Sequence, residues 1–108
     1  MKEGESVTMQ NISKVSLFPL GQLVMSRGVA DQVAEDSNFA LFCLRSLRRH
    51  AAGDWGDLCV EDKRENQFAR KEGNLRIFSA YEQKDLPKIW IITEADRSVT
   101  TTLFPADY

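Results

Sequence analysis

The chain has 108 residues, of which 43% are hydrophobic and 28% are charged, values typical of a globular domain rather than of a disordered chain. Its net charge of −2 lacks the basic excess of proteins that bind nucleic acid or anionic membranes, so nucleic acid is not the favoured partner. No stretch approaches the roughly 18 apolar residues that span a bilayer, and the acidic start is unlike a signal peptide. We therefore expect one soluble domain in the cytoplasm, with no membrane partner.

Metal binding is not indicated by the residues available for it. Cys43 and Cys59 form no Cys-x-x-Cys pair, and His50 is the only histidine. This set is too sparse for a zinc site, so we expect no metal and no cofactor. A cytosolic chain of this size needs no disulfide, so both thiols are expected to be reduced.

The first half of the chain predicts a strand followed by two helices. Residues 1–16 are polar and without periodicity, which indicates a flexible N-terminal segment before a single domain over 17–108. The β-prone run that follows predicts a short strand over 22–25, after which Ser26 can cap a helix that runs to about Glu35. A second helix is expected after residues 36–38 and is ended by Gly53. Its apolar residues recur at three- and four-residue spacing on one buried face: Phe39, Cys43, Leu44, Leu47 and Ala51.

A loop over 53–58 and a third helix come next. The loop contains two glycines, two aspartates and Trp55, a composition typical of a tight turn around one large apolar side chain. The helix is predicted from about Glu61 to Glu72, and Gly73 ends it. Phe68 and Ala69 are its main apolar residues, so we expect it to pack through a narrow stripe.

The last third has the clearest β-pattern. Alternating residues predict strands over 75–81, 88–93 and 98–104, joined by short turns. Trp90 lies on one face of the middle strand and Ile89 and Ile91 on the other, which indicates a central strand that is covered on both faces. The fold class is therefore α+β: an N-terminal strand, about three helices and a C-terminal three-stranded antiparallel β-meander, in one mostly antiparallel sheet.

Several motifs resemble one bacterial family. They are Phe-Pro-Leu-Gly-Gln over 18–22, Arg49-His50, Gly-Asp-Trp-Gly-Asp over 53–57, Asn66, Thr-Glu-Ala-Asp-Arg-Ser over 93–98 and Leu-Phe-Pro-Ala-Asp-Tyr over 103–108. Together they are similar to short hypothetical proteins called "plasmid-related protein", some of which carry a name from type I restriction-modification subunits. The resemblance covers residues 18–108, with Ser26 where the family usually has Thr. It implies a bacterial, plasmid-borne or phage-borne setting but no established activity, and the chain has no room for a methyltransferase or a motor.

One group of residues has a possible catalytic interpretation. His50 lies four residues before Asp54 and seven before Asp57, so an imidazole beside carboxylates would have the geometry of a general base. Glu94 in the last hairpin is a further candidate acid. The simpler interpretation is that His50 satisfies the last carbonyls of its helix and that the aspartates cap the following turn. We favour the simpler interpretation because no nucleophile is visible.

The candidate binding residues also have structural interpretations. The arginines of the second helix form either a phosphate-binding stripe or a solvated surface, and the acidic composition favours the second. We expect Trp55 to be mostly buried, since an exposed Trp gains nothing from ordering a loop with two glycines. We also expect Arg97 to bind one of the loop aspartates, or an aspartate to cap the third helix. The candidate binding residues are Arg45, Arg48, Arg49, Trp55, Asp96 and Arg97.

Two functions follow from these alternatives. The first is a non-enzymatic protein-binding or accessory module of a mobile element, in anti-defence or plasmid maintenance, acting on a protein partner through a helix face or a strand edge. The second is a small hydrolase or nuclease-type toxin that uses His50 and nearby carboxylates. The sequence favours the first because it contains no recognised catalytic motif.

Overall fold

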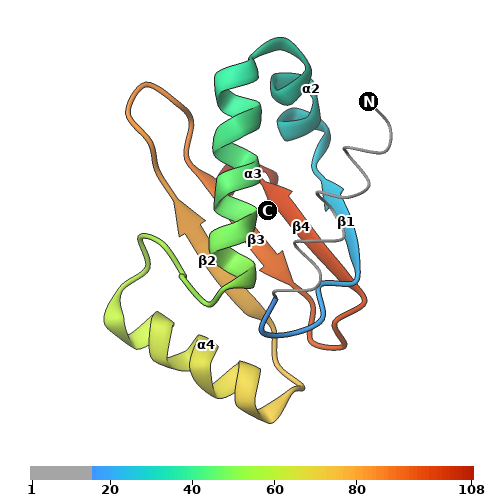
Figure 1. The fold of residues 1–108 in the computed structure, drawn as a ribbon, viewed down its shortest axis with the longest axis vertical. Helices are drawn as coiled ribbons and strands as arrows, with labels where there is room; N and C mark the ends of the chain where they lie inside the picture. Colours follow the sequence, from blue (N-terminus) through green and yellow to red (C-terminus); the bar gives the residue numbers. More distant parts are fainter. Residues whose placement is uncertain (1–15) are drawn as a thin grey trace.

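A computed structural model describes residues 16–108, so the predicted N-terminal segment lies, apart from Ser16, outside the described residues. Within 16–108 the α+β class is confirmed, with three α-helices and one four-stranded sheet (Figure 1). The elements are β1 (Gln22–Met25), α2 (Arg27–Glu35), α3 (Ser37–Ala51), α4 (Val60–Glu72), β2 (Ile77–Tyr81), β3 (Ile89–Thr93), β4 (Val99–Leu103) and the 3-10 helix η1 (Pro105–Asp107).

The strand order is β1-β4-β3-β2. The antiparallel meander of β2, β3 and β4 is confirmed, and β3 is a central strand with Ile89 and Ile91 fully buried. β1 pairs parallel to β4, with Gln22 opposite Val99, so the sheet is mixed. A parallel neighbour is possible because the chain passes through three helices and two strands before it returns beside β1.

The helix ends follow from local side-chain chemistry. The hydroxyl of Ser26 accepts a hydrogen bond from the Val29 N–H at 3.3 Å and caps α2, as expected. Asp36 caps α3 by accepting from the N–H groups of its first turn. Gly73 ends α4 in the left-handed region at φ +79°, where glycine is favoured. The prediction that an aspartate caps α4 is wrong, because Cys59 holds that position without a side-chain hydrogen bond.

Both α2 and α3 pack on the same face of the sheet, and α3 crosses it in Figure 1. This layer contains Val29, Phe39, Phe42, Cys43, Tyr81, Ile89 and Ile91. The second face carries the alternate strand residues, which include Phe78, Trp90 and Ile92. The fold therefore covers one face of the sheet with two helices and leaves much of the other to side chains of the sheet itself.

A second core cluster fixes the loop after α3 and the start of β2. Trp55 is 4% exposed and packs with Phe18 and Ile77, so the expectation that it is mostly buried is confirmed. Gly56, at φ +73°, lies so close to the Ala80 carbonyl that any side chain would collide with it. The loop is therefore held against β2 by contacts that require both its tryptophan and its glycine.

α4 lies beside β2 and packs through Ala69, as expected, but with Asn66 in place of Phe68. Asn66 and Ala69 are buried, whereas Phe68 is 56% exposed. Residues three apart share one side of a helix, so burial of Asn66 and Ala69 turns Phe68 away from the core. The prediction that Phe68 belongs to the packing stripe is therefore wrong.

Candidate functional site

His50 lies in the last turn of α3 with its side chain fully buried. Its Nδ1 is 2.6 Å from Ser79 Oγ, and its Nε2 is 2.9 Å from Thr93 Oγ1. The rings of Phe18 and Trp55 contact the imidazole edge-on, at centroid distances of 5.4 and 5.8 Å. Because both ring nitrogens bond to the sheet, the prediction that His50 satisfies the carbonyls of its own helix is wrong.

The hydrogen-bond chain around His50 has one consistent direction. Thr100 Oγ1 donates to the Leu20 carbonyl at 2.7 Å, and Thr93 Oγ1 lies 2.7 Å from Thr100 Oγ1. Each hydroxyl has a single proton, so Thr93 donates to Thr100, and His50 Nε2–H donates to Thr93. Ser79 Oγ lies 2.6 Å from Nδ1 and 3.5 Å from the Ile91 carbonyl, so Ser79 donates to Nδ1 when the imidazole is neutral. Burial favours the same state, because it lowers the pKa of His50 to about 3.

The loop carboxylates that would act with His50 have other partners. Asp54 accepts hydrogen bonds from Arg49 at 2.7 and 3.1 Å, and these bonds hold the pKa of Asp54 below its usual value. Asp57 Oδ2 accepts from the main-chain N–H of Glu82 at 2.8 Å. Neither aspartate bonds to the imidazole of His50.

Glu94 is also separated from the histidine. Its Oε1 lies 3.4 Å from Arg76 Nε, in a pair whose side chains are largely exposed. The Ser79 and His50 side chains are close enough for proton transfer, but both are fully buried, so a substrate would have no access to them. The cluster therefore acts as a polar link between α3, β2 and β3.

Arg97 binds main-chain carbonyls and not a loop aspartate, so that prediction is wrong. Its guanidinium donates to the carbonyls of Ala69 at 3.0 Å, Leu75 at 2.7 Å and Glu94 at 3.0 Å. Burial lowers the pKa of Arg97. The loop aspartates lie along β2, whereas the turn of Arg97 meets the end of α4, so Arg97 ties that helix end to the last hairpin.

The three arginines of α3 form no common site. Arg49 is paired with Asp54, Arg45 Nη2 lies 3.5 Å from Gln83 Oε1, and Arg48 is exposed. Residues three and four apart lie on one side of a helix, so the three share a face, but no contact joins them within the described residues. These contacts support the interpretation of the three arginines as a solvated helix surface rather than as a phosphate-binding stripe.

Two further candidate binding residues have structural contacts. Asp96 Oδ1 accepts from the Ser98 N–H at 3.0 Å within the β3–β4 turn, and hydrogen bonding to Ser98 lowers the pKa of Asp96. Trp55 is buried in the core and is not available to a partner.

On the second face of the sheet, three aromatic side chains lie together with an arginine and an isoleucine. We call this group the aromatic patch: Arg76, Phe78, Trp90, Ile92 and Tyr108. These residues line a hollow of about 280 Å³. Trp90 packs edge-on between Phe78, at a centroid distance of 5.0 Å, and Tyr108, at 5.7 Å. Arg76 donates to the Tyr108 hydroxyl at 2.8 Å, which raises the pKa of Arg76. Trp90 is half-buried, and Tyr108 is exposed.

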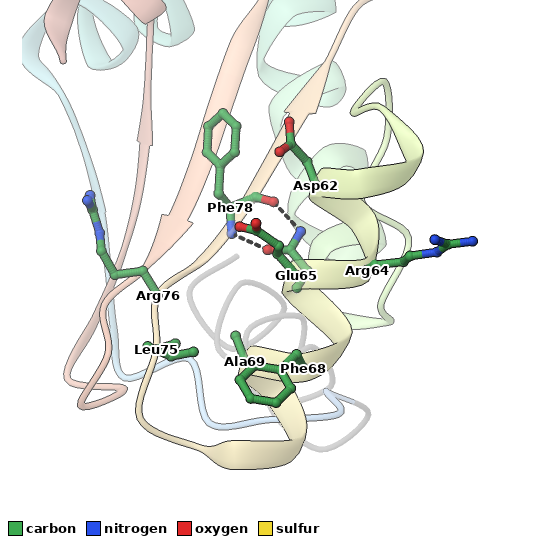
Figure 2. A pocket seen from close by; sticks show the side chains of 9 residues that line it. Asp62, Arg64, Glu65, Phe68, Ala69, Leu75, Arg76 and Phe78 are labelled. Atoms are coloured by element: carbon green, nitrogen blue, oxygen red, sulfur yellow. Dashed lines mark hydrogen bonds between the residues drawn. The ribbon is translucent and has the colours of Figure 1, made fainter.

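A larger hollow of about 640 Å³, the α4 pocket, lies between α4 and the start of β2 (Figure 2). It is lined by Asp62, Arg64, Glu65, Asn66, Phe68, Ala69, Leu75, Arg76 and Phe78. At this pocket the Asn66 side chain donates to the Phe78 carbonyl and accepts from the Phe78 N–H, and these bonds hold α4 against β2. Figure 2 shows Arg64 pointing away from the pocket, so the charged residues beside its apolar floor are Asp62, Glu65 and Arg76.

None of the candidate catalytic or binding residues proposed from the sequence lies in the aromatic patch or the α4 pocket. Phe78 and Trp90 lie twelve positions apart, and only the register that places Ala80 opposite Trp90 brings their rings together. Tyr108 reaches the patch through η1, which had no sequence signal. The alternation of Phe78 with Ile77, and of Trp90 with Ile89 and Ile91, did indicate that large aromatic side chains share the face opposite the buried isoleucines.

No three His, Cys, Asp or Glu side chains within 16–108 are placed to hold a metal ion. None of the helices described is long and apolar enough to cross a membrane. No family model, curated protein or solved structure matches this chain.

Proposed function

We propose that this protein is a non-enzymatic binding module that engages a protein partner through the aromatic patch and the α4 pocket. One observation carries the proposal: Arg76 and Phe78 line both hollows, so the two form one continuous surface. Exposed Phe68, Leu75 and Tyr108 lie along it. Contiguous exposed apolar surface of this kind marks interaction sites, whereas single exposed apolar residues are ordinary.

The residue types of the surface fit a protein partner. Trp, Tyr and Arg dominate the energetic centres of protein interfaces, and Trp90, Tyr108 and Arg76 lie together here. The carboxylates of Asp62 and Glu65 beside the α4 pocket disfavour a phosphate backbone. A partner with apolar side chains and a basic rim complements this surface.

The hydrolase alternative has less support. His50 is buried and neutral, and its hydrogen bonds go to hydroxyl groups of the core. A general base must reach the proton that it removes, directly or through one water. The resemblance to plasmid-related proteins adds a setting to the binding proposal, in which the partner belongs to plasmid maintenance or to host defence.

The proposal is tested by affinity capture with matched surface variants. Phe68→Ser combined with Tyr108→Ser removes two exposed apolar side chains from the surface at little cost to folding. Leu41→Ser is the control, because Leu41 is 50% exposed on α3 and lines neither hollow. Each variant is immobilised and exposed to bacterial lysate, and the retained proteins are identified by mass spectrometry.

We expect at least one protein that the wild type and the Leu41→Ser control retain equally and that the double variant loses. Retention of the same proteins by all three chains would contradict the proposed surface. Circular dichroism of each variant confirms that the comparison is between folded chains.

A further inference from the structure

The two edge strands of the sheet differ in how their outer main-chain groups are satisfied. Along β2, the Asn66 side chain bonds to both main-chain groups of Phe78. The N–H of Asp57 donates to the Ala80 carbonyl at 2.8 Å, and the Asp57 carboxylate accepts from the Glu82 N–H. The β2 edge is therefore closed to further strand pairing.

The β1 edge has no comparable cover among the residues described. The N–H groups of Gln22, at the start of β1, and of Ser26, directly after it, donate to the carbonyls of Ser98 and Thr102 at 3.0 and 2.9 Å. Main-chain groups alternate in direction along a strand, so the N–H and C=O groups of Leu23 and Met25 point away from β4. Within residues 16–108, these four groups have no main-chain partner on that side.

An apolar groove of about 260 Å³ runs beside this edge, between β1 and α3. Leu23 and Met25 line it from the strand, and Ala40, Leu44 and Leu47 line it from the helix. No charged side chain lines it, and Met25 is 47% exposed. An added strand would thus find main-chain partners and an apolar surface in the same place.

We propose that a second copy of this chain covers the edge, with the two β1 strands paired antiparallel about a two-fold axis at Val24. In this register Leu23 lies opposite Met25 of the partner subunit, and each such pair exchanges both main-chain hydrogen bonds. All four outward groups of each strand are then satisfied, and the two four-stranded sheets become continuous.

The charge pattern favours a copy of the chain as the occupant. Like charges that face each other across paired strands destabilise the pair, and neither β1 nor the groove lining contains a charge. Charged residues and Pro on an edge strand oppose its pairing, and Gln22–Met25 contains neither. The two-fold axis also brings the exposed Met25 side chains of the two copies into one apolar seam.

A disulfide trap tests the register. Residues opposite each other in a non-hydrogen-bonded antiparallel pair have Cα atoms about 4.5 Å apart, which is within disulfide range. Val24→Cys, in a Cys59→Ser background, is therefore expected to form a covalent dimer of about twice 12.3 kDa under mild oxidation. Leu41→Cys in the same background is the control, since Leu41 is exposed on α3 and does not line the groove.

Light scattering after size exclusion tests the dimer without any crosslink. The average mass measured for the full chain is expected to rise from 12.3 kDa towards twice that value as the protein concentration increases. Met25→Lys places a charge at the edge without touching the core and should weaken the dimer at least about tenfold, whereas Leu41→Lys should not.

The proposal is overturned if the wild type stays at 12.3 kDa up to about 1 mM, a concentration that covers weak dimers. It is also overturned if Met25→Lys leaves the dimer intact, or if Val24→Cys crosslinks no faster than Leu41→Cys. These outcomes are independent of the proposed function, which concerns the other face of the sheet.

Discussion

The hydrogen-bond chain from Ser79 through His50, Thr93 and Thr100 to the Leu20 carbonyl joins five parts of the polypeptide inside an apolar core. With a neutral imidazole, His50 accepts from Ser79 at Nδ1 and donates to Thr93 at Nε2, so both ring nitrogens are satisfied. Loss of one hydroxyl leaves a buried polar group without a partner, which costs more than the bond itself contributes. This makes the single histidine a structural residue whose titration can be followed without overlap from others.

The first prediction concerns pH. The pKa of His50 is about 3 in the folded chain and 6.5 in the unfolded chain, so between these values only the unfolded chain binds the proton. The free energy of unfolding should therefore fall as the pH falls through this window, by up to about 1.4 kcal/mol per pH unit. Urea unfolding at several pH values measures it, with His50→Gln expected to have a shallower slope. A ¹⁵N spectrum in which the folded imidazole titrates near pH 6.5 would contradict the buried, neutral assignment.

The second prediction concerns Thr93. Thr93→Val keeps the shape of the side chain but removes the acceptor of the His50 Nε2–H, so it should lower the free energy of unfolding by about 1–3 kcal/mol. Thr101→Val is the matched control, because Thr101 is half-buried on the other face of the same sheet and makes no side-chain hydrogen bond within the described chain. Equal free energies of unfolding for the two variants would show that the hydrogen-bond chain through His50 contributes nothing to stability.

At the scale of elements, β2 depends on α4 for its outer edge. Asn66 bonds to both main-chain groups of Phe78 and holds the side of the α4 pocket in place. An amide side chain in this role replaces a neighbouring strand, and it closes the edge to other chains.

The third prediction follows from that contact. Asn66→Ala should release the Phe78 amide, so that its hydrogen exchange becomes at least about tenfold faster and stability falls by about 1–3 kcal/mol. Gln67→Ala is the control, since Gln67 is exposed and its side chain accepts a hydrogen bond from Arg70 of the same helix, not from β2. Unchanged protection of Phe78 in Asn66→Ala would show that α4 does not hold the edge.

The elements themselves were largely predictable, because their signals are local. Capping by Ser26, the left-handed Gly73 and the alternation over β2 each depend on residues within one turn or strand. The parallel pairing of β1 with β4 was not predictable, since the residues of β1 contain nothing that specifies which strand they meet. Arg97 was assigned to an aspartate because opposite charges pair, but its position at the end of α4 supplied carbonyls instead.

The candidate surface was less predictable than the fold for a related reason. Phe78, Trp90 and Tyr108 come from β2, β3 and the end of the chain, and only the tertiary register assembles them. His50 was the opposite case, because its neighbours in sequence suggested chemistry while its neighbours in space are core hydroxyl groups. Residues close in sequence thus suggested a catalytic group at His50 that the structure does not form, and residues far apart in sequence form the aromatic patch, which contains none of the candidate residues.

At the scale of the whole molecule, the two proposals reinforce each other. A two-fold axis perpendicular to the sheet at β1 would place α2 and α3 of both copies on one side and both aromatic patches on the other. A partner with two contact sites, or a dimeric partner, would then gain avidity from simultaneous engagement. The binding surface remains complete within one copy, since every residue of the aromatic patch and the α4 pocket belongs to a single chain.

In-cell photo-crosslinking tests the binding surface most directly. A benzoylphenylalanine at position 68 projects from the α4 pocket, and the same group at position 41 is the control on α3. We predict that irradiation of bacterial cells yields an adduct with a different protein from position 68 only, and that Tyr108→Ser weakens it. Absence of an adduct at position 68, or equal adducts from positions 68 and 41, would contradict the account.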